Sequence, residues 1–190
     1  PENRAQIERN AALLGLPITV VENRLFEAAA SAGKSPCYLC ARMRRGCLYR
    51  SAQELGCNKI ALGHHFDDVI ETVLMSMLYG GEMKTMMPKV HSAHFAGMEL
   101  IRPLYRVREQ AVIGWARYNG LSFLRCACRL TEGTATGQLD SKRQEMKELI
   151  RALEHRSPSV GANIFHSFHN VNLGTLVGLS LIHISEPTRH

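Results

Sequence analysis

The 190-residue sequence lacks any run that approaches the roughly 20 consecutive apolar residues of a membrane-spanning helix. It also lacks internal repeats, low-complexity tracts and, at its first residues, the basic and apolar pattern of a secretory signal. Hydrophobic residues make up 45% and charged residues 21%, which is typical of a globular domain. These features exclude a collagen, a coiled coil, a disordered chain and an integral membrane protein. We expect a cytoplasmic protein without a membrane partner.

The two ends of the sequence bear on the extent of the domain. The first residue is Pro1 rather than Met, and residues 3–14 already show helical spacing, so we expect the chain to start inside a longer protein. Residues 179–190 resemble the translation of a sequencing adaptor. The expected domain therefore covers residues 1–178, and the tail 179–190, with its two histidines, is excluded from the candidate site.

Positive charge is in excess. Lys and Arg number 23 against 17 Asp and Glu, which gives a net charge of +6 and favours a polyanionic partner such as nucleic acid or a nucleotide. One basic group lies in a predicted helix and consists of Arg42, Arg44 and Arg45. A second group that could follow a phosphate backbone consists of Lys84, Lys89, Arg102, Arg106 and Arg108. A solvated helix face is the alternative interpretation of the first group.

The pattern of secondary structure predicts an α/β fold. Helices are expected over 3–14, 24–32, 39–55, from Asp67 to about 78, 107–118, 141–153 and shortly after 158, and strands over 18–21, 59–62, 98–101 and 121–124. Because strands and helices alternate, we expect a parallel sheet with helices on both faces. Ligands of such sheets bind beyond the carboxyl ends of the strands. Two segments follow expected strands in this way, 63–68 and 126–128.

The cysteines indicate a metal or cluster site rather than disulfides. Cys37 and Cys40 are separated by two residues near the expected start of a helix, and Cys126 and Cys128 follow a different strand. Thiolates at a helix N-terminus have a lowered pKa, which favours metal binding. One residue between Cys126 and Cys128 is cramped for two ligands of one tetrahedral ion. Three cysteines with an open fourth position therefore favour an iron–sulfur cluster, while structural zinc and a redox dithiol stay open alternatives.

The segment Gly63-His-His-Phe-Asp-Asp68 is the second candidate site. Gly63 is expected to turn the chain, and Asp67 is expected to cap the following helix. Two adjacent carboxylates at the ligand edge of a sheet could also hold Mg²⁺ or orient a nucleophile. His64 and His65 are expected to form hydrogen bonds or packing contacts at the strand end, at least for one of the two.

These motifs resemble those of the TtcA group, the tRNA 2-thiocytidine synthetases of the PP-loop ATPase superfamily. The resemblance rests on five segments in order and covers about residues 2–178: Pro36-Cys-Tyr-Leu-Cys-Ala-Arg-Met-Arg-Arg-Gly46, Ala61-Leu-Gly-His-His-Phe-Asp-Asp-Val-Ile-Glu-Thr72, Tyr79-Gly-Gly81, Met87-Pro-Lys89 and Ile101-Arg-Pro103. It implies an adenine nucleotide α-hydrolase-like fold. It also implies transfer of sulfur to C2 of an anticodon-loop cytidine after ATP has adenylated the C2 oxygen.

The resemblance further implies particular roles for residues of this chain. Cys37 and Cys40, with Cys126 or Cys128 as the third ligand, correspond to the residues that hold a [4Fe-4S] cluster. The pair Asp67 and Asp68 corresponds to acidic residues linked to ATP, Mg²⁺ or catalysis, and Arg44 to a basic residue near the active site. Gly63, His64 and Arg45 are the expected cofactor-binding residues. The implied partners are tRNA, a sulfur donor of the cysteine desulfurase type and a second copy of the chain as a homodimer.

One element of the family is missing from the sequence. The phosphate loop Ser-Gly-Gly-x-Asp-Ser does not occur in the 190 residues. We expect it upstream of Pro1, and we expect residues 1–190 alone to be inactive. The alternatives are a non-enzymatic tRNA-binding module with zinc or a cluster, a thiolase acting on a tRNA uridine, and a thiol–disulfide oxidoreductase using Cys37 and Cys40.

Overall fold

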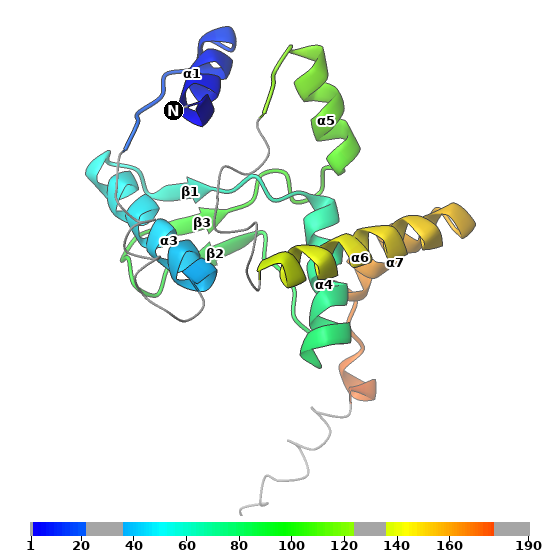
Figure 1. Cartoon of the computed structure of the whole chain (residues 1–190). Helices are drawn as coiled ribbons and strands as arrows, with labels where there is room; N and C mark the ends of the chain where they lie inside the picture. Colours follow the sequence, from blue (N-terminus) through cyan, green and yellow to red (C-terminus); the bar gives the residue numbers. More distant parts are fainter. Residues whose placement is uncertain (1, 22–35, 124–135, 177–190) are drawn as a thin grey trace, which may run out of the picture.

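The computed structural model describes residues 2–21, 36–123 and 136–176, with side chains from residue 3 and without those of 36–42 and 136–141. The expected helix 24–32, Cys126, Cys128 and the tail 179–190 lie outside this part. Within it, six α-helices and a small sheet form an α/β fold (Figure 1). The elements are α1 (Glu2–Leu13), α3 (Pro36–Glu54), β1 (Lys59–Ala61), α4 (Phe66–Gly80), β2 (Lys89–His91), β3 (Glu99–Ile101), α5 (Glu109–Tyr118), α6 (Thr136–Arg156), α7 (Val160–Ser167) and the short 3-10 helix η2 (Leu173–Thr175).

The sheet is mixed rather than purely parallel. Its strand order is β1-β3-β2. The expected strands around β1 and β3 are confirmed and run parallel, with Ile60 opposite Leu100. The antiparallel strand β2 lies in a stretch expected to be a connection. All three of its residues are exposed, so it has no apolar pattern. At its ends Lys89 forms an ion pair with Glu99 at 2.6 Å, and Nδ1 of His91 lies 3.4 Å from the same carboxylate.

Two expected strands are wrong. Residues 18–21 and 121–123 belong to no sheet, and the fourth residue of the second strand, 124, lies outside the described part. Hydrogen bonds to a helix replace the expected ladder at Ser122. Its carbonyl accepts from the Asn10 side chain at 2.7 Å, and its N–H donates to that side chain at 3.4 Å. A β-branched run such as 18–21 forms a strand only beside a partner strand, and none of the described strands pairs with it.

Two apolar clusters hold the elements together. Helix α3 packs on the sheet through Tyr49, which contacts Met98 and Leu100. Helices α4, α6 and α7 pack on one another beyond the ends of the strands (Figure 1). Their shared core consists of Val69, Ile70, Tyr105, Ile150 and Phe165. No helix of the described part is long and apolar enough to span a bilayer. The fold thus leaves α3 on one side and α4 on the other side of the carboxyl edge of β1 and β3.

Candidate functional site

The turn from β1 into α4 is closed by His65 and not by Asp67, which corrects the expected N-cap. The N–H of Asp68 donates to Nδ1 of His65 at 3.4 Å, and the N–H of His65 donates to the Asp68 carboxylate at 3.0 Å. This reciprocal capping box satisfies two backbone donors at the start of the helix. The N-cap lies two residues earlier than expected, at His65, where an imidazole nitrogen replaces the more usual oxygen acceptor.

Asp67 caps a different helix from its own. Its Oδ2 accepts a hydrogen bond from the N–H of Glu109, the first residue of α5, at 2.6 Å. Its Oδ1 lies 3.3 Å from Arg108, whose guanidinium also donates to both carboxylate oxygens of Glu154 on α6, at 2.9 and 3.0 Å. Asp67 therefore connects α4 to α5 and, through Arg108, to α6.

Asp68 and Glu71 face the cations of α6. Arg143 lies 3.1 Å from Asp68 and 3.3 Å from Glu71, and Lys147 lies 3.8 Å from Glu71 and 2.9 Å from Glu109. Glu71 is only 1% exposed. Burial raises the pKa of Glu71 to about 7, although Lys147 and Arg143 oppose that shift. We call Asp67, Asp68, Glu71 and Glu109 with these cations and Arg108 the charge network.

The charge network leaves no carboxylate oxygen of the aspartate pair without a partner. Each of the four oxygens of Asp67 and Asp68 lies near a backbone N–H or a guanidinium. In the described residues no group of three or more His, Cys, Asp or Glu side chains is arranged to hold a metal ion. The pair in this arrangement does not fit a Mg²⁺ site, because the neutralising charge already comes from arginines. The catalytic role of the pair stays a prediction.

His64 points to the other side of the strand edge, toward α3. It lines a cavity of about 170 Å³ together with Arg44 and Arg45 of α3, and the lining also includes Tyr49 and Leu100. The Nδ1 atom of His64 is buried without a hydrogen-bond partner in the described residues. Burial lowers the pKa of His64, with Asp68 acting in the opposite sense, so the ring is neutral near pH 7. The structure thus brings together His64 of one motif and Arg44 and Arg45 of another.

Gly63 does not need to be glycine on steric grounds. It is not among the residues with a positive φ, and a Cβ atom built there would meet nothing within 4 Å. The open space beside it is on the same edge of the sheet as His64. The predicted cofactor-binding role of Gly63 stays a prediction.

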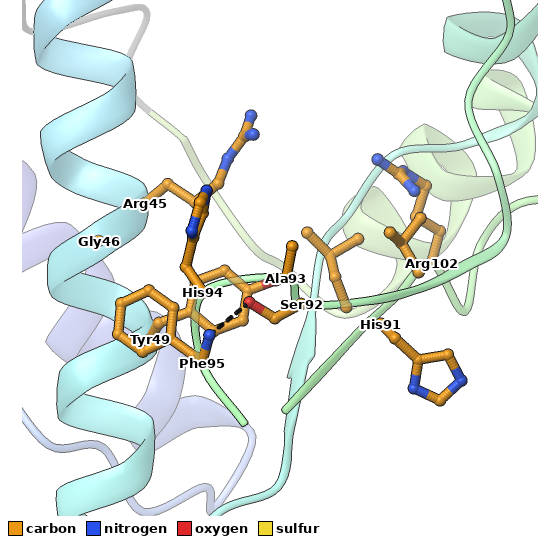
Figure 2. A pocket seen from close by; sticks show the side chains of 11 residues that line it. Arg45, Gly46, Tyr49, His91, Ser92, Ala93, His94, Phe95 and Arg102 are labelled. Carbon is orange, nitrogen blue, oxygen red and sulfur yellow. Dashed lines mark hydrogen bonds between the residues drawn. The ribbon is translucent and has the colours of Figure 1, made fainter. Parts of the chain in front are cut away.

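A larger cavity lies beside the first and was not expected from the sequence. It has a volume of about 870 Å³ and is bounded by α3, the connection between β2 and β3, and the segment after β3 (Figure 2). We call it the arginine cavity, and its lining includes Arg45, Tyr49, His94, Phe95 and Arg102. Because Arg102 follows β3 and His64 follows the parallel strand β1, both cavities lie at the expected ligand edge of the sheet.

The second basic group of the sequence divides in the structure. Arg102 lines the arginine cavity, whereas Arg108 belongs to the charge network. Lys89 is paired with Glu99 at 2.6 Å and Lys84 with Glu82 at 3.5 Å. Three residues of the group thus have acidic partners, and its role along a phosphate backbone stays a prediction. We did not expect Tyr49, His94 and Phe95 to line the arginine cavity, because no motif or spacing links them in the sequence.

The predicted cluster ligands lie only partly within the described residues. Cys37 and Cys40 occupy positions three residues apart in the first turns of α3, and such positions share one side of a helix. Arg44 and Arg45 follow one turn later on the same helix. Cys126 and Cys128 are outside the described part. The cluster assignment is therefore still a prediction, and α3 is the element that would connect it to the cavities.

Comparisons with known proteins give one consistent result. A model of the PP-loop domain matches residues 2–128. The tRNA-cytidine(32) 2-sulfurtransferases of Geobacter metallireducens, Geobacter sulfurreducens and Cellvibrio japonicus are 38%, 41% and 37% identical over 154, 149 and 173 residues. These matches cover 81%, 78% and 90% of this chain and 58%, 56% and 55% of the relatives. The chain thus spans little more than half the length of these curated relatives.

A solved structure is similar in fold. It is the U34-tRNA thiolase NcsA from Methanococcus maripaludis with its [4Fe-4S] cluster, with a TM-score of 0.67 and 21% sequence identity. The similarity covers 88% of this chain and 55% of that one. It agrees with the α/β fold expected from the sequence.

Proposed function

This chain belongs to the PP-loop domain family, and on that premise we propose that it is part of an ATP-dependent tRNA sulfurtransferase. The proposed reaction replaces the C2 oxygen of an anticodon-loop cytidine, position 32, by sulfur. The names of the relatives that are 37–41% identical support this reaction and tRNA as the substrate. A cysteine desulfurase as sulfur donor, a homodimeric state and a cytoplasmic location belong to the same proposal.

The observation that carries the proposal is the meeting of two distant motifs in one cavity. Arg44 and Arg45 come from the helix that begins with the cysteine pair, and His64 comes from the turn after β1. Such a site combines the fixed positive charge of two arginines with an imidazole whose pKa is lowered by burial. Activation of a carbonyl oxygen by a nucleotide develops negative charge on phosphate, which arginine side chains stabilise well.

The residues present fit a cluster better than they fit a magnesium ion. Two cysteines three residues apart on α3 and a further pair at 126 and 128 are the soft thiolate donors that iron–sulfur clusters require. When bound, a [4Fe-4S] cluster would supply sulfur at an open iron, and ATP would make the C2 oxygen a good leaving group. The glycine-rich motif expected to cradle the ATP phosphates does not occur in the 190 residues.

Several described residues have roles that do not depend on a bound cluster or on ATP. Arg44 and Arg45 place positive charge beside the small cavity, and the His64 ring forms part of its lining, with Nδ1 buried. Asp67 and Asp68 act as positioning residues, because they fix the His64 turn against α5 and α6. Loss of either carboxylate would release this turn.

The first test is iron binding. After anaerobic reconstitution, we expect the chain to contain iron and sulfide, and Cys37→Ala and Cys40→Ala to lose both. Cys57→Ala is the matched control, since Cys57 is exposed in the loop after α3. Stoichiometric zinc without iron uptake would favour the tRNA-binding module instead.

The second test is the reaction itself. The longest natural protein that contains this chain is incubated with ATP, a sulfur source and unmodified tRNA, and the nucleosides are analysed by mass spectrometry. We expect 2-thiocytidine in the wild type and its loss in Arg44→Ala and Cys37→Ala. The appearance of a thiolated uridine would show the uridine thiolase to be the correct function.

A further inference from the structure

Two arginines of the arginine cavity lack the acidic partners that several other described arginines have. Arg4, Arg108 and Arg143 each form an ion pair with a carboxylate. In the part of the chain that the structure describes, neither Arg45 nor Arg102 has a carboxylate within ion-pairing distance. Figure 2 shows them reaching toward the cavity from two sides, Arg45 from α3 and Arg102 from the segment after β3.

This arrangement carries an electrostatic cost. Arg102 is half-buried, its Nε atom has no hydrogen-bond partner, and its Nη1 donates to the carbonyl of Met87. Burial and, after it, the positive charge of Arg45 lower the pKa of Arg102. Two like charges held near each other with little neutralisation are destabilising, and an anion between them would offset that cost.

The walls that hold the two guanidiniums are firmly packed. The rings of Tyr49 and Phe95 stack with centroids 4.8 Å apart and planes 8° from parallel. The N–H of Phe95 donates to the Ser92 hydroxyl at 3.1 Å, which fixes the bend of the connection between β2 and β3. His94 lies on this connection beside Arg45, and His91, which also lines the cavity, has its Nδ1 atom 3.4 Å from Glu99. The cavity is therefore built before any ligand enters.

The lining favours a phosphate of a polymer backbone over a free nucleotide. Nucleotide phosphates are usually bound by the backbone N–H groups of a glycine-rich turn or a helix N-terminus. Here Arg45, Gly46 and Tyr49 lie in the interior of α3, where the backbone N–H groups are used within the helix. Charged side chains supply the recognition instead, as is common for RNA and DNA backbones. The volume of about 870 Å³ also leaves room for the sugars on both sides of a phosphate.

We propose that Arg45 and Arg102 together bind one backbone phosphate of the RNA substrate, with His94 at the rim of the same cavity. The proposal rests on the proposed function, because it takes tRNA as the polyanion. It adds a substrate contact that lies apart from the charge network. Arg45 lines both cavities, so the proposal assigns it to the RNA phosphate and leaves Arg44 as the arginine of the small cavity alone. It also distinguishes Arg102 from the neighbouring Arg108, whose charge is already neutralised by Asp67 and Glu154.

The experiment measures binding of an unmodified tRNA transcript to the full chain by fluorescence anisotropy between about 50 and 200 mM salt. The variants are Arg45→Gln, Arg102→Gln and the double variant. Arg117→Gln, an exposed arginine on α5, is the control with the same change in charge. Arg45 is exposed, so its variant is expected to fold, and thermal unfolding checks the Arg102 variant.

We expect each single variant to bind tRNA about tenfold more weakly and to reduce the slope of log K against log salt by about 1. The loss in the double variant should differ from the sum of the two single losses, because both side chains hold the same phosphate and are therefore coupled. Arg117→Gln should bind within about twofold of the wild type, because an exposed charge away from the contact is largely screened by salt.

Some results would overturn only this proposal, and one would also overturn the proposed function. Unchanged affinity and slope in Arg45→Gln, with normal wild-type binding, would remove the phosphate contact but not the tRNA-modifying function. Losses that simply add in the double variant would show two separate contacts. Reduced ATP affinity of the variants with unchanged tRNA binding would show that the two arginines bind a nucleotide phosphate instead of RNA. If the wild type binds no tRNA at all, the proposed function fails together with this inference.

Discussion

The buried carboxyl group of Glu71 predicts a dependence of stability on pH that can be isolated by one substitution. Burial raises its pKa from 4.5 to about 7. Each pH unit corresponds to about 1.4 kcal/mol, so the full difference is about 3 kcal/mol. Because the folded state holds this proton more tightly than the unfolded chain, the contribution favours folding below pH 4.5. It is lost as the pH rises toward 7 and is absent above that value.

The substitution Glu71→Gln keeps the shape of the side chain and removes its titrating carboxyl group. We expect the free energy of unfolding of the wild type, minus that of Glu71→Gln, to fall by about 3 kcal/mol between pH 4.5 and pH 8. Urea unfolding at several pH values measures this difference, and other titrating groups cancel in the subtraction. Glu54→Gln, at the exposed end of α3, is the matched control for the loss of one carboxylate.

The refuting result is a difference that stays flat or rises with pH. It would mean that Arg143 and Lys147, at 3.3 and 3.8 Å from Glu71, outweigh burial and keep the carboxylate ionised in the folded protein. In that case Glu71→Gln would leave the two cations of α6 without their buried partner. The variant would then lose stability most strongly at neutral pH.

Three further predictions concern the core and the contacts around the site, and thermal unfolding checks each of them. Ile70→Ala, at a fully buried position of α4, should lower the free energy of unfolding by about 3 kcal/mol. Leu78→Ala on the same helix, where Leu78 is 57% exposed, should lower it by under about 1 kcal/mol. Equal losses of stability in the two variants would contradict this packing of α4. His65→Ala should cost about 1 kcal/mol through loss of the cap, and His65→Asn should restore most of it unless the ring is needed for another contact. Arg108→Gln should lower the free energy of unfolding by about 1 kcal/mol at low salt and by less at high salt, because the ion pair of Arg108 with Glu154 is partly exposed. A loss of stability that does not depend on salt would argue against an ionic contribution.

Local pattern predicted most helices and the two parallel strands. The period of apolar residues is a property of neighbouring positions, and it indicated α4 and α5 to within a few residues. The same kind of reasoning failed at β2 and at residues 18–21, because a strand exists only through its pairing with a distant segment. It also failed at the start of α4, where an imidazole rather than a carboxylate supplies the cap.

The residue types available for chemistry could be read from the sequence: the cysteine pair, the arginines of α3, and the turn with His64 and two aspartates. Their order and spacing were enough to indicate the family. Which charges are neutralised and which are left to bind a ligand depends instead on the packing of the folded chain. Arg102 and Arg108 are close in sequence, yet Arg108 meets Asp67 and Glu154, while Arg102 faces Arg45 across a cavity. An arginine's partner depends on which helices pack beside it, and that packing is set by apolar contacts between segments far apart in the chain.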